Sequence, residues 1–497
     1  MRNQTKDVLD RIREAQQNPM DLAKAFVQST SPTSGLTAYD LEPGAKALYP
    51  VETPLRNKIP RVGAGRGTQA NWKAITGINI NSISVGVSDG NRGGVVSTAV
   101  QEYMAAYRGI GLEDFVSFEA DYAAEGFDDL KATSCQGLLR AVMIGEEEII
   151  VGGNTSLPLG QTPTPIVADL ATGGALAANA AVSVRVAALT MDAYLTGSID
   201  TGVRGLVTRT NADGSSDTYG GGTAKVSPAT AITTANDGNA THALAVTVAP
   251  VTGAVGYAWF WGTAGNELLG AITTINSLEI TAAATGTQTA SSLGAGDNST
   301  NLLVFDGLIS MIAKPGSNSY IHVMPTGTIG QGTPLTADGL GGIVEIDAAL
   351  KHFWDRYRLS PTAILVSSQE QTSITKKVLA GSQQGSQRFV INVNQGDIQG
   401  GDLVTSYTNK YTMRGARSIA IIPHPNLPPG TILFITDAMP YPLAGISNVL
   451  QMRCRRDYYQ LEWPLKTRKY EYGVYFDGVL QNYFPPAFGM ITNIGAG

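Results

Sequence analysis

Hydrophobic and polar residues alternate with two different periods along this chain, and each period predicts one kind of element. Apolar residues recur at intervals of three and four in residues 127–151 and 341–358, which predicts two amphipathic helices. Residues 3–17 show a shorter stretch of the same kind. The glycine pair at 152–153 is expected to end the first of the two long helices.

A period of two in residues 72–104 predicts a pair of strands. Isoleucine and valine alternate with smaller or polar residues up to the turn sequence DGN at 89–91, and a second alternating run follows the glycine pair at 93–94. Asp-Gly and Gly-Gly favour the backbone of a tight turn. We therefore expect a long protruding hairpin, in which Lys73 is the only lysine.

Residues 29–66 have a different character, because five prolines recur among isolated apolar residues. Such a segment cannot build a core of its own and predicts an extended arm. An arm of this kind is stable only when it lies against something else. Here that is either the rest of the same chain or a neighbouring subunit.

Residues 157–300 form the sharpest change in composition, since alanine, threonine and glycine dominate and cations almost vanish. Short apolar runs at 182–189, 242–251 and 256–262 are separated by turn signals, which predicts a β-sandwich. Its core is expected to include Trp259 and Trp261. The phrase PVTGAVGYAWFWG (250–262) resembles the second strand region of fibronectin-type or immunoglobulin-like modules. The phrase VSVRVAAL (182–189) resembles a later strand of such modules but comes earlier here, so either the topology is rearranged or one of the two matches is wrong.

After residue 340 the pattern predicts mixed helices and strands. One further helix is expected at 367–379. The expected strands lie at 363–366, 418–422, 431–435, 468–473 and 474–479.

Composition narrows the functional classes. Charged residues make up 15% of the 497 residues, well below the ~25% of typical soluble proteins, and this favours a subunit that buries surface against other copies. The net charge of −6 and the absence of a polybasic tract argue against tight binding to phosphate backbones. No signal peptide or membrane span is expected, and Cys135 and Cys454 are interpreted as small buried residues.

Sequence motifs of enzymes are weak in this chain. The sequence GVSDG (86–90) matches the nucleophile elbow but precedes no helix, GAGRG (63–67) lacks the residues of a phosphate loop, and NADGSSD (211–217) is favoured as a hairpin turn over a calcium loop. The run Glu146–Glu148 is interpreted as a solvated face or an inter-subunit contact. The four histidines lack metal-ligand spacing, so no catalytic residue, cofactor or metal is expected.

The order of these elements resembles the major capsid proteins of tailed bacteriophages, whose fold is shared with encapsulins. The resemblance rests on the arm, the hairpin, the long helix, the segments LVFDGLISMIA (303–313) and IAIIPHPNLPPGTILFITD (419–437), and the β-rich tail. It implies an α+β phage capsid fold with an N-terminal arm, an extended hairpin loop, a peripheral domain with a spine helix and an axial domain, plus an all-β immunoglobulin-like insertion. The implied boundaries are 1–67 for the arm, 68–106 for the hairpin loop, 107–156 for the peripheral domain completed by 300–335 and 452–497, 157–299 for the insertion, and 336–451 for the axial domain.

The resemblance also implies partners and contacts. The chain would assemble with itself into pentamers and hexamers of an icosahedral virion shell, which encloses double-stranded DNA without sequence-specific binding and displays the insertion outside. Portal, scaffolding and cement proteins are candidate partners, and assembly would occur in the host cytoplasm. Candidate inter-subunit residues are Arg56, Lys73, Asp89 and Arg92.

Two other structural classes and an enzyme remain as alternatives. An encapsulin-like compartment would share the fold and need a cargo peptide. A β-rich phage adhesin or tail protein would explain the insertion but not the helices at 127–151 and 341–358.

Overall fold

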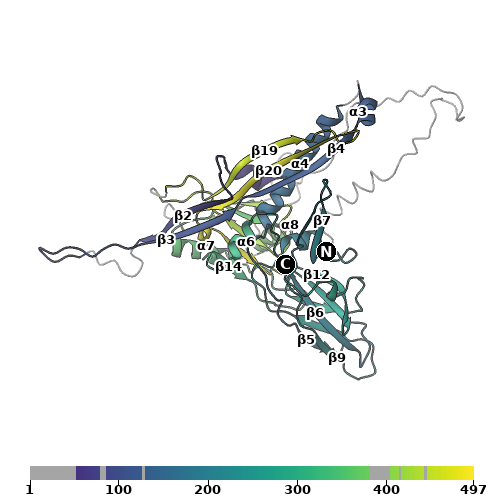
Figure 1. Cartoon of the computed structure of the whole chain (residues 1–497). Coiled ribbons are helices and arrows are strands. Elements are labelled where there is room, and N and C mark those ends of the chain that lie inside the picture. The colour runs from purple at the N-terminus through teal and green to yellow at the C-terminus, as the bar shows by residue number, and fades with distance from the viewer. Residues whose placement is uncertain are drawn as a thin grey trace, which may run out of the picture. The chain divides into compact units, whose positions relative to one another are not determined.

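The structure is a computed structural model that describes residues 52–78, 86–125, 129–380, 403–412, 416–441 and 445–496. The helix expected at 3–17 and the first part of the arm expected at 29–66 lie outside the described residues. Helices and strands occur together through the described part, so the predicted α+β class is confirmed (Figure 1).

The chain forms two compact units. Among the described residues, the first combines 52–53 with residues of Leu112–Ile144 and Gln460–Val474, and the second holds the others. In the first unit, Phe118 packs on Tyr470 with ring centroids 4.6 Å apart. Cys135 is only partly buried there, whereas Cys454 in the second unit is buried, so the expectation of a buried thiol is confirmed for Cys454 alone.

Both long helices predicted from the period of their apolar residues are confirmed. They are α4 (Leu130–Gly152) and α7 (Val344–Tyr357), and α8 (Ser368–Ala380) follows where a third was expected. The shorter helices are α3 (Phe118–Ala124), α5 (Met191–Thr196), α6 (Leu308–Ala313) and the 3-10 turns η1 (Ala290–Leu293) and η2 (Pro485–Ala487). Within the described residues no helix is long and apolar enough to span a membrane.

The arm was expected to be extended, and this is wrong for its last part. Residues Pro54–Lys58 form the short helix α2, with Pro54 at its first position, where a missing N–H costs nothing. Leu55 and Ile59 are buried in the main core. The apolar residues at this spacing therefore anchor the end of the arm to its own chain.

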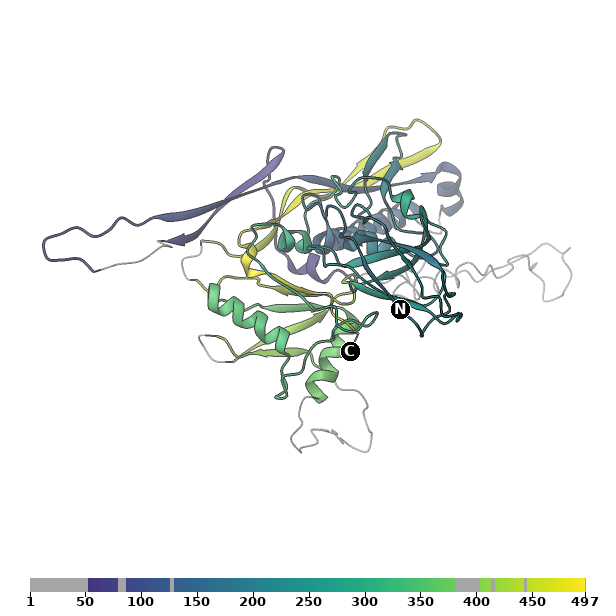
Figure 2. The same ribbon diagram turned by 90° about the horizontal axis from the view of Figure 1, so that it is seen from below.

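A six-stranded sheet forms the centre of the second unit, in the order β14-β21-β18-β15-β17-β16. Its strands are β14 (Tyr320–Val323), β15 (Ala363–Val366), β16 (Ser406–Asn409), β17 (Arg417–Pro423), β18 (Ile432–Ile435) and β21 (Gly489–Thr492). Figure 2 shows α7 and α8 beside this sheet. The sheet joins strands from both the predicted axial domain and the predicted peripheral domain.

A four-stranded sheet has the order β1-β19-β20-β4. Its strands are β1 (Arg61–Val62), β4 (Arg108–Ser117), β19 (Leu450–Glu462) and β20 (Lys469–Asn482). The two strands expected at 468–473 and 474–479 are in fact the single strand β20, because no turn interrupts residues Lys469–Asn482. Strands from opposite ends of the chain meet in this sheet, since β1 pairs in parallel with β19.

The insertion contains two sheets that share a core. One has the order β13-β10-β5 and the other β12-β11-β6-β9, and Val184, Leu244 and Trp259 lie between them. The strands are β5 (Ile166–Leu170), β6 (Ala181–Leu189), β9 (Thr230–Thr233), β10 (Ala243–Thr247), β11 (Gly256–Thr263), β12 (Asn266–Thr273) and β13 (Ser277–Ile280), and a separate hairpin joins β7 (Leu206–Thr210) to β8 (Ser216–Gly220). The predicted sandwich of short strands is thus present, and its immunoglobulin-like topology remains a prediction.

The predicted hairpin is formed by β2 (Gln69–Ile78) and β3 (Thr98–Ala106), which pair antiparallel with a bulge between Ile75 and Gly77 (Figure 1). The second strand begins later than expected, since residues 91–97 form no strand, and the part of the first run at residues 79–85 lies outside the described residues. The turn lies where DGN predicted it, with Gly90 at φ +78° and the amide of Asn91 donating to the Ser88 carbonyl.

Candidate functional site

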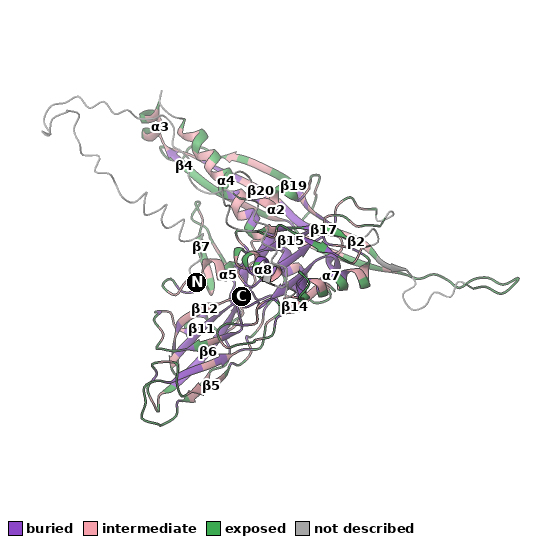
Figure 3. Ribbon diagram, turned by 180° about the vertical axis from the view of Figure 1, so that it is seen from behind, coloured by how far each residue is buried: buried purple, intermediate pink, exposed green. Residues whose placement is uncertain are grey.

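One face of the β2–β3 hairpin consists of exposed side chains. The register places three pairs on this face, Asn71 opposite Met104, Lys73 opposite Glu102 and Ile75 opposite Val100. Ile75 is 67% exposed, Met104 72% and Val100 51%. We call these six residues the outer face of the hairpin, and Figure 3 colours the described part of the hairpin as mainly exposed.

An ion pair divides the apolar residues of the outer face. The ammonium of Lys73 contacts the carboxylate of Glu102, and both side chains are 68% exposed. These residues face each other across the strands, which is the arrangement in which opposite charges favour one strand register. The result is a surface with apolar patches on both sides of a central pair of opposite charges.

The opposite face of the hairpin packs on the chain itself. Trp72 stacks on Tyr103 with centroids 5.8 Å apart, and its Nε1 donates to the carbonyl of Asn482 at 2.9 Å. The edge of Tyr483 meets the same indole, and Ala70 is buried. The alternation of the strand thus separates an inner face with a partner from an outer face with none among the described residues.

The tip of the hairpin carries Asp89 and Arg92, both exposed. Ser88, the central residue of the GVSDG match, accepts a hydrogen bond from the side chain of Asn91 at 2.6 Å. No helix follows it, so the residues of this match form a turn and lack the geometry of a nucleophile elbow. Exposed Val87, Val95 and Val96 lie on the same part of the hairpin.

A second arrangement of functional side chains lies inside the second unit, around the last turns of α4. The Glu147 carboxylate accepts the backbone N–H groups of Leu55 at 2.9 Å and Arg56 at 2.7 Å, so it caps the first turn of α2. His424 Nε2 lies 2.7 Å from the same carboxylate. The Nδ1 of His424 accepts from the amide of Asn426 at 3.2 Å, which assigns the proton to Nε2.

The neighbouring carboxylate, Glu146, binds the other end of the same segment. Arg61 donates to it at 2.8 Å and also reaches Asp457 at 2.8 Å. Burial opposes the charge of Arg61, but the hydrogen bonds and charges of Asp457 and Glu146 outweigh it, so the pKa of Arg61 is raised. The Tyr458 hydroxyl also contacts Glu146, and burial first and this carboxylate second raise the pKa of Tyr458.

These contacts correct the interpretation of residues 146–148. Glu146 and Glu147 are fully buried rather than part of a solvated face. Arg56, a candidate inter-subunit residue, lies 3.6 Å from Glu146 within the same chain, and its side chain is 17% exposed. We call this group of buried charges the arm-root cluster, because it fixes the segment Pro54–Val62 to the body of the second unit.

Two further motifs receive structural roles. The GAGRG segment (63–67) lies against β19, where the amide of Gly65 donates to the Cys454 carbonyl at 3.0 Å. A side chain at Gly65 would collide with the Tyr107 hydroxyl at 2.7 Å, so glycine is needed for a close approach. The NADGSSD segment (211–217) forms the turn between β7 and β8, as predicted, with Gly214 at φ +85°.

Trp259 and Trp261 lie in the sandwich core, as predicted, with exposures of 0% and 8%. Their indole N–H groups donate to the Thr273 hydroxyl at 2.7 Å and to the Ala282 carbonyl at 2.9 Å. Both aromatic residues are therefore satisfied within the core and offer no ligand platform.

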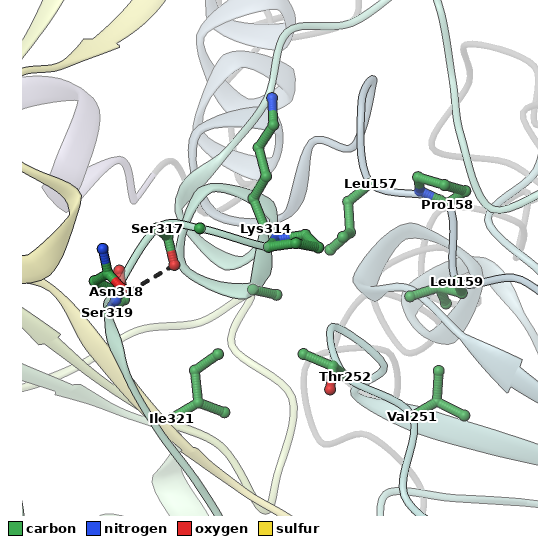
Figure 4. A pocket seen from close by; sticks show the side chains of 13 residues that line it. Leu157, Pro158, Leu159, Val251, Thr252, Lys314, Ser317, Asn318, Ser319 and Ile321 are labelled. Carbon is green, nitrogen blue, oxygen red and sulfur yellow. Dashed lines mark hydrogen bonds between the residues drawn. The ribbon is translucent and has the colours of Figure 1, made fainter. Parts of the chain in front are cut away.

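A cavity of about 510 Å³ lies beside residues 157–159 and 313–321 (Figure 4). Its apolar lining includes Leu157, Leu159, Val251 and Ile321, and among the described residues Lys314 is the only ionisable one that lines it. The ammonium of Lys314 donates to Ser156 at 3.1 Å. This lining lacks a pair of groups for acid and base chemistry. Among the described residues, no group of three or more histidine, cysteine, aspartate or glutamate side chains is arranged to hold a metal ion.

No protein-family model and no curated protein matches this chain. Solved structures with a similar fold include the capsid of a native GTA particle, at 6% identity over 93% of this chain and 96% of that chain with a TM-score of 0.39. The capsid of Myoviridae phage XM1 gives 10% identity over 93% and 100% of the two chains, with a TM-score of 0.39.

The chain is also similar to the SrpI encapsulin of Synechococcus elongatus PCC 7942, at 9% identity over 91% and 93% of the two chains with a TM-score of 0.37. These likenesses span nearly the whole chain. Since the TM-scores lie below 0.5 and the identities below 25%, they establish no function for it.

Proposed function

We propose that this protein is a major capsid protein of a tailed bacteriophage, a shell subunit that assembles with copies of itself. The observation that carries this proposal is the outer face of the hairpin. It exposes Ile75, Val100 and Met104 on a pair of strands whose other face is already packed. A two-stranded hairpin is marginally stable in water, so a second surface that covers it is expected.

A second copy of the chain is the partner that best fits this surface. Burial of each large apolar side chain contributes ~1.5–3 kcal/mol, so three of them supply a contact of modest strength. A closed shell repeats such a contact many times, and the repetition makes a weak contact sufficient. The low charged fraction of 15% is consistent with a subunit that buries much of its surface.

The finer parts of the proposal follow from the same assembly. The subunits form pentamers and hexamers of an icosahedral virion shell around double-stranded DNA, without sequence-specific contacts to the DNA. The insertion is displayed on the outer surface. Portal, scaffolding and cement proteins are further partners. In this arrangement Lys73, Asp89 and Arg92 contact a neighbour, whereas Arg56 acts through the arm-root cluster of its own chain.

The first experiment expresses the chain alone and examines the soluble fraction by size-exclusion chromatography and negative-stain electron microscopy. Hollow shells of megadalton mass are expected. Small oligomers alone, even after addition of purified phage partners, would contradict the proposal and favour an adhesin or tail protein, which is expected as a trimer or smaller.

A matched pair of variants tests the surface itself. Ile75→Asp places a charge on the outer face, whereas Leu206→Asp places the same charge on strand β7, where Leu206 is 65% exposed. We expect Ile75→Asp to abolish shells and leave the subunit folded, and Leu206→Asp to assemble as the natural chain does. If both variants assemble to the same extent, the outer face of the hairpin is not a contact between subunits.

An encapsulin-like compartment is the second candidate, since its shell uses the same assembly principle. It differs in its contents, because it requires a cargo protein with a docking peptide. Shells purified from the native source separate the two candidates by whether they contain double-stranded DNA or a cargo protein.

A further inference from the structure

The insertion contains a histidine that two carboxylates hold from opposite sides. His242 precedes β10 and has a fully buried side chain. Its Nδ1 lies 3.0 Å from Asp169 at the end of β5, and its Nε2 lies 3.0 Å from Asp237 in the preceding loop. Asp169 and Asp237 remain partly exposed, at 19% and 34%.

The geometry assigns the charge state of this histidine. Ionised carboxylates only accept hydrogen bonds, so both ring nitrogens can bond their partners only when both carry a proton. The arrangement therefore favours the imidazolium form. The hydrogen bond to Asp237 is the largest cause that raises the pKa of His242, and it outweighs the opposing burial with the help of Asp169.

The same carboxylates organise the backbone around the histidine. Asp169 accepts the amide of Ala235 at 2.8 Å, and Asp237 accepts the amide of Asn239 at 2.9 Å. The backbone of His242 exchanges two hydrogen bonds with Leu176. The three side chains thus connect the end of β5 to the loop 235–241. Backbone hydrogen bonds to Thr241 and His242 connect the loop 171–176 to the same point.

We propose that Asp169, His242 and Asp237 form a pH-controlled clamp, which holds the loops 171–176 and 235–241 together while the imidazole is protonated and loosens them as it loses its proton. This clamp is independent of the assembly proposal, because it rests on contacts within the insertion. The strand register places Glu279 of β13 on the opposite face of the sheet, so Asp169 and Asp237 are the charged groups that face the ring among the described residues.

The pH range follows from the direction of each shift. A raised pKa means that the stabilisation from His242 is complete below its ordinary value of ~6.5 and is lost as pH rises through the raised value. The hydrogen bond from His242 lowers the pKa of Asp237 to about 2, so its contribution is lost only as pH falls from ~4 towards that value. The clamp therefore holds below pH ~6.5 and loosens as pH rises through the raised pKa of His242.

Hydrogen exchange of the full chain, measured by mass spectrometry between pH 5 and pH 9 and corrected for the intrinsic exchange rate, tests the clamp. In the natural chain, protection of residues 171–176 and 235–242 is expected to fall several-fold as pH rises. Peptides covering β15 serve as the internal reference. Protection that does not change with pH would overturn the proposal.

Variants separate the clamp from general alkaline loosening. His242→Gln is expected to give low protection at every pH, whereas His322→Gln, on β14, is expected to behave as the natural chain does. Asp237→Asn keeps the histidine but removes one charged partner, so the pH at which half of the protection is lost should fall. If His242→Gln fails to fold, Asp237→Asn alone tests the clamp. An unchanged midpoint in Asp237→Asn, or an unchanged pH dependence in His242→Gln, would contradict the clamp.

Discussion

The β2–β3 hairpin and the sandwich of the insertion are both built from strands in which apolar residues alternate with others. They differ in whether these apolar residues are buried within the chain. Trp259 on β11 is completely buried between two sheets of its own chain. Ile75 on β2 is 67% exposed, although the hairpin has an equally regular alternation. The sandwich completes its core by itself, whereas the hairpin completes only its inner face.

The difference teaches where a partner is needed. Two sheets can cover each other, but a single pair of strands always leaves one face open unless another element covers it. The inner face is covered through Trp72, and the outer face is not covered by any described residue. This contrast shows that the insertion builds its core within its own chain. It supports the proposal that a neighbouring subunit covers the outer face of the hairpin.

The largest loss of stability is expected from a substitution in the core of the sandwich. Trp259→Ala removes a fully buried indole and its hydrogen bond to Thr273, so we expect a loss of ~3–5 kcal/mol in the free energy of unfolding. Chemical denaturation followed by fluorescence measures it. A loss below ~1 kcal/mol would show that the sandwich does not depend on its own core.

A smaller loss of stability is expected from a substitution in the arm-root cluster. In Glu147, Oε1 accepts from Leu55 and His424, and Oε2 accepts from Arg56. Glu147→Gln replaces one of these two oxygens by an NH2 group, which cannot accept a hydrogen bond. We expect ~1–3 kcal/mol of destabilisation, measured by denaturation. Glu148→Gln, at an exposed position on the same helix, is the control and should change stability by no more than ~0.5 kcal/mol.

The inner face of the hairpin is expected to show an effect of ~1 kcal/mol. Trp72→Phe keeps an aromatic ring against Tyr103 but removes the N–H that donates to Asn482. Faster hydrogen exchange of β2 and β3 in the unassembled subunit is the measurement. If exchange is unchanged, the hairpin is not held to its chain through this contact.

The smallest effect on the subunit is expected on the outer face. The charge swap Lys73→Glu with Glu102→Lys keeps an exposed ion pair, so the stability of the subunit should change by no more than ~0.5 kcal/mol. If a neighbouring subunit contacts these two charges, the swap places the wrong charge against it. The yield of particles in size-exclusion chromatography should then fall although the stability of the subunit is unchanged. Equal yields for the swapped and natural chains would show that the pair acts only within the hairpin.

Local patterns predicted most of the elements. The period of three to four residues located α4 and α7, and the period of two located β6, β11 and the hairpin, because these periods follow directly from how each element exposes its faces. The segment Pro54–Lys58 was missed as a helix, since five residues are too few to show a period. Its helical form depends on Glu147 from another part of the chain.

The candidate site was predicted less completely. The hairpin and its exposed tip residues Asp89 and Arg92 were predicted from turn chemistry, and their contacts with a neighbour remain a prediction. The burial of Glu146 and Glu147 was not predicted, because a run of three acidic residues is usually solvated. The pairing of His242 with two aspartates gave no signal in the sequence spacing.

The sequence by itself determined the kinds of elements, their order and the position of the turn at residues 89–91, because these depend on neighbours within a few residues. Only the tertiary structure decided which charges are buried and which apolar residues stay exposed. Glu146 is buried because Arg61 and Tyr458, far away in the chain, neutralise and cover it. Ile75 is exposed because no described segment reaches the outer face of its hairpin.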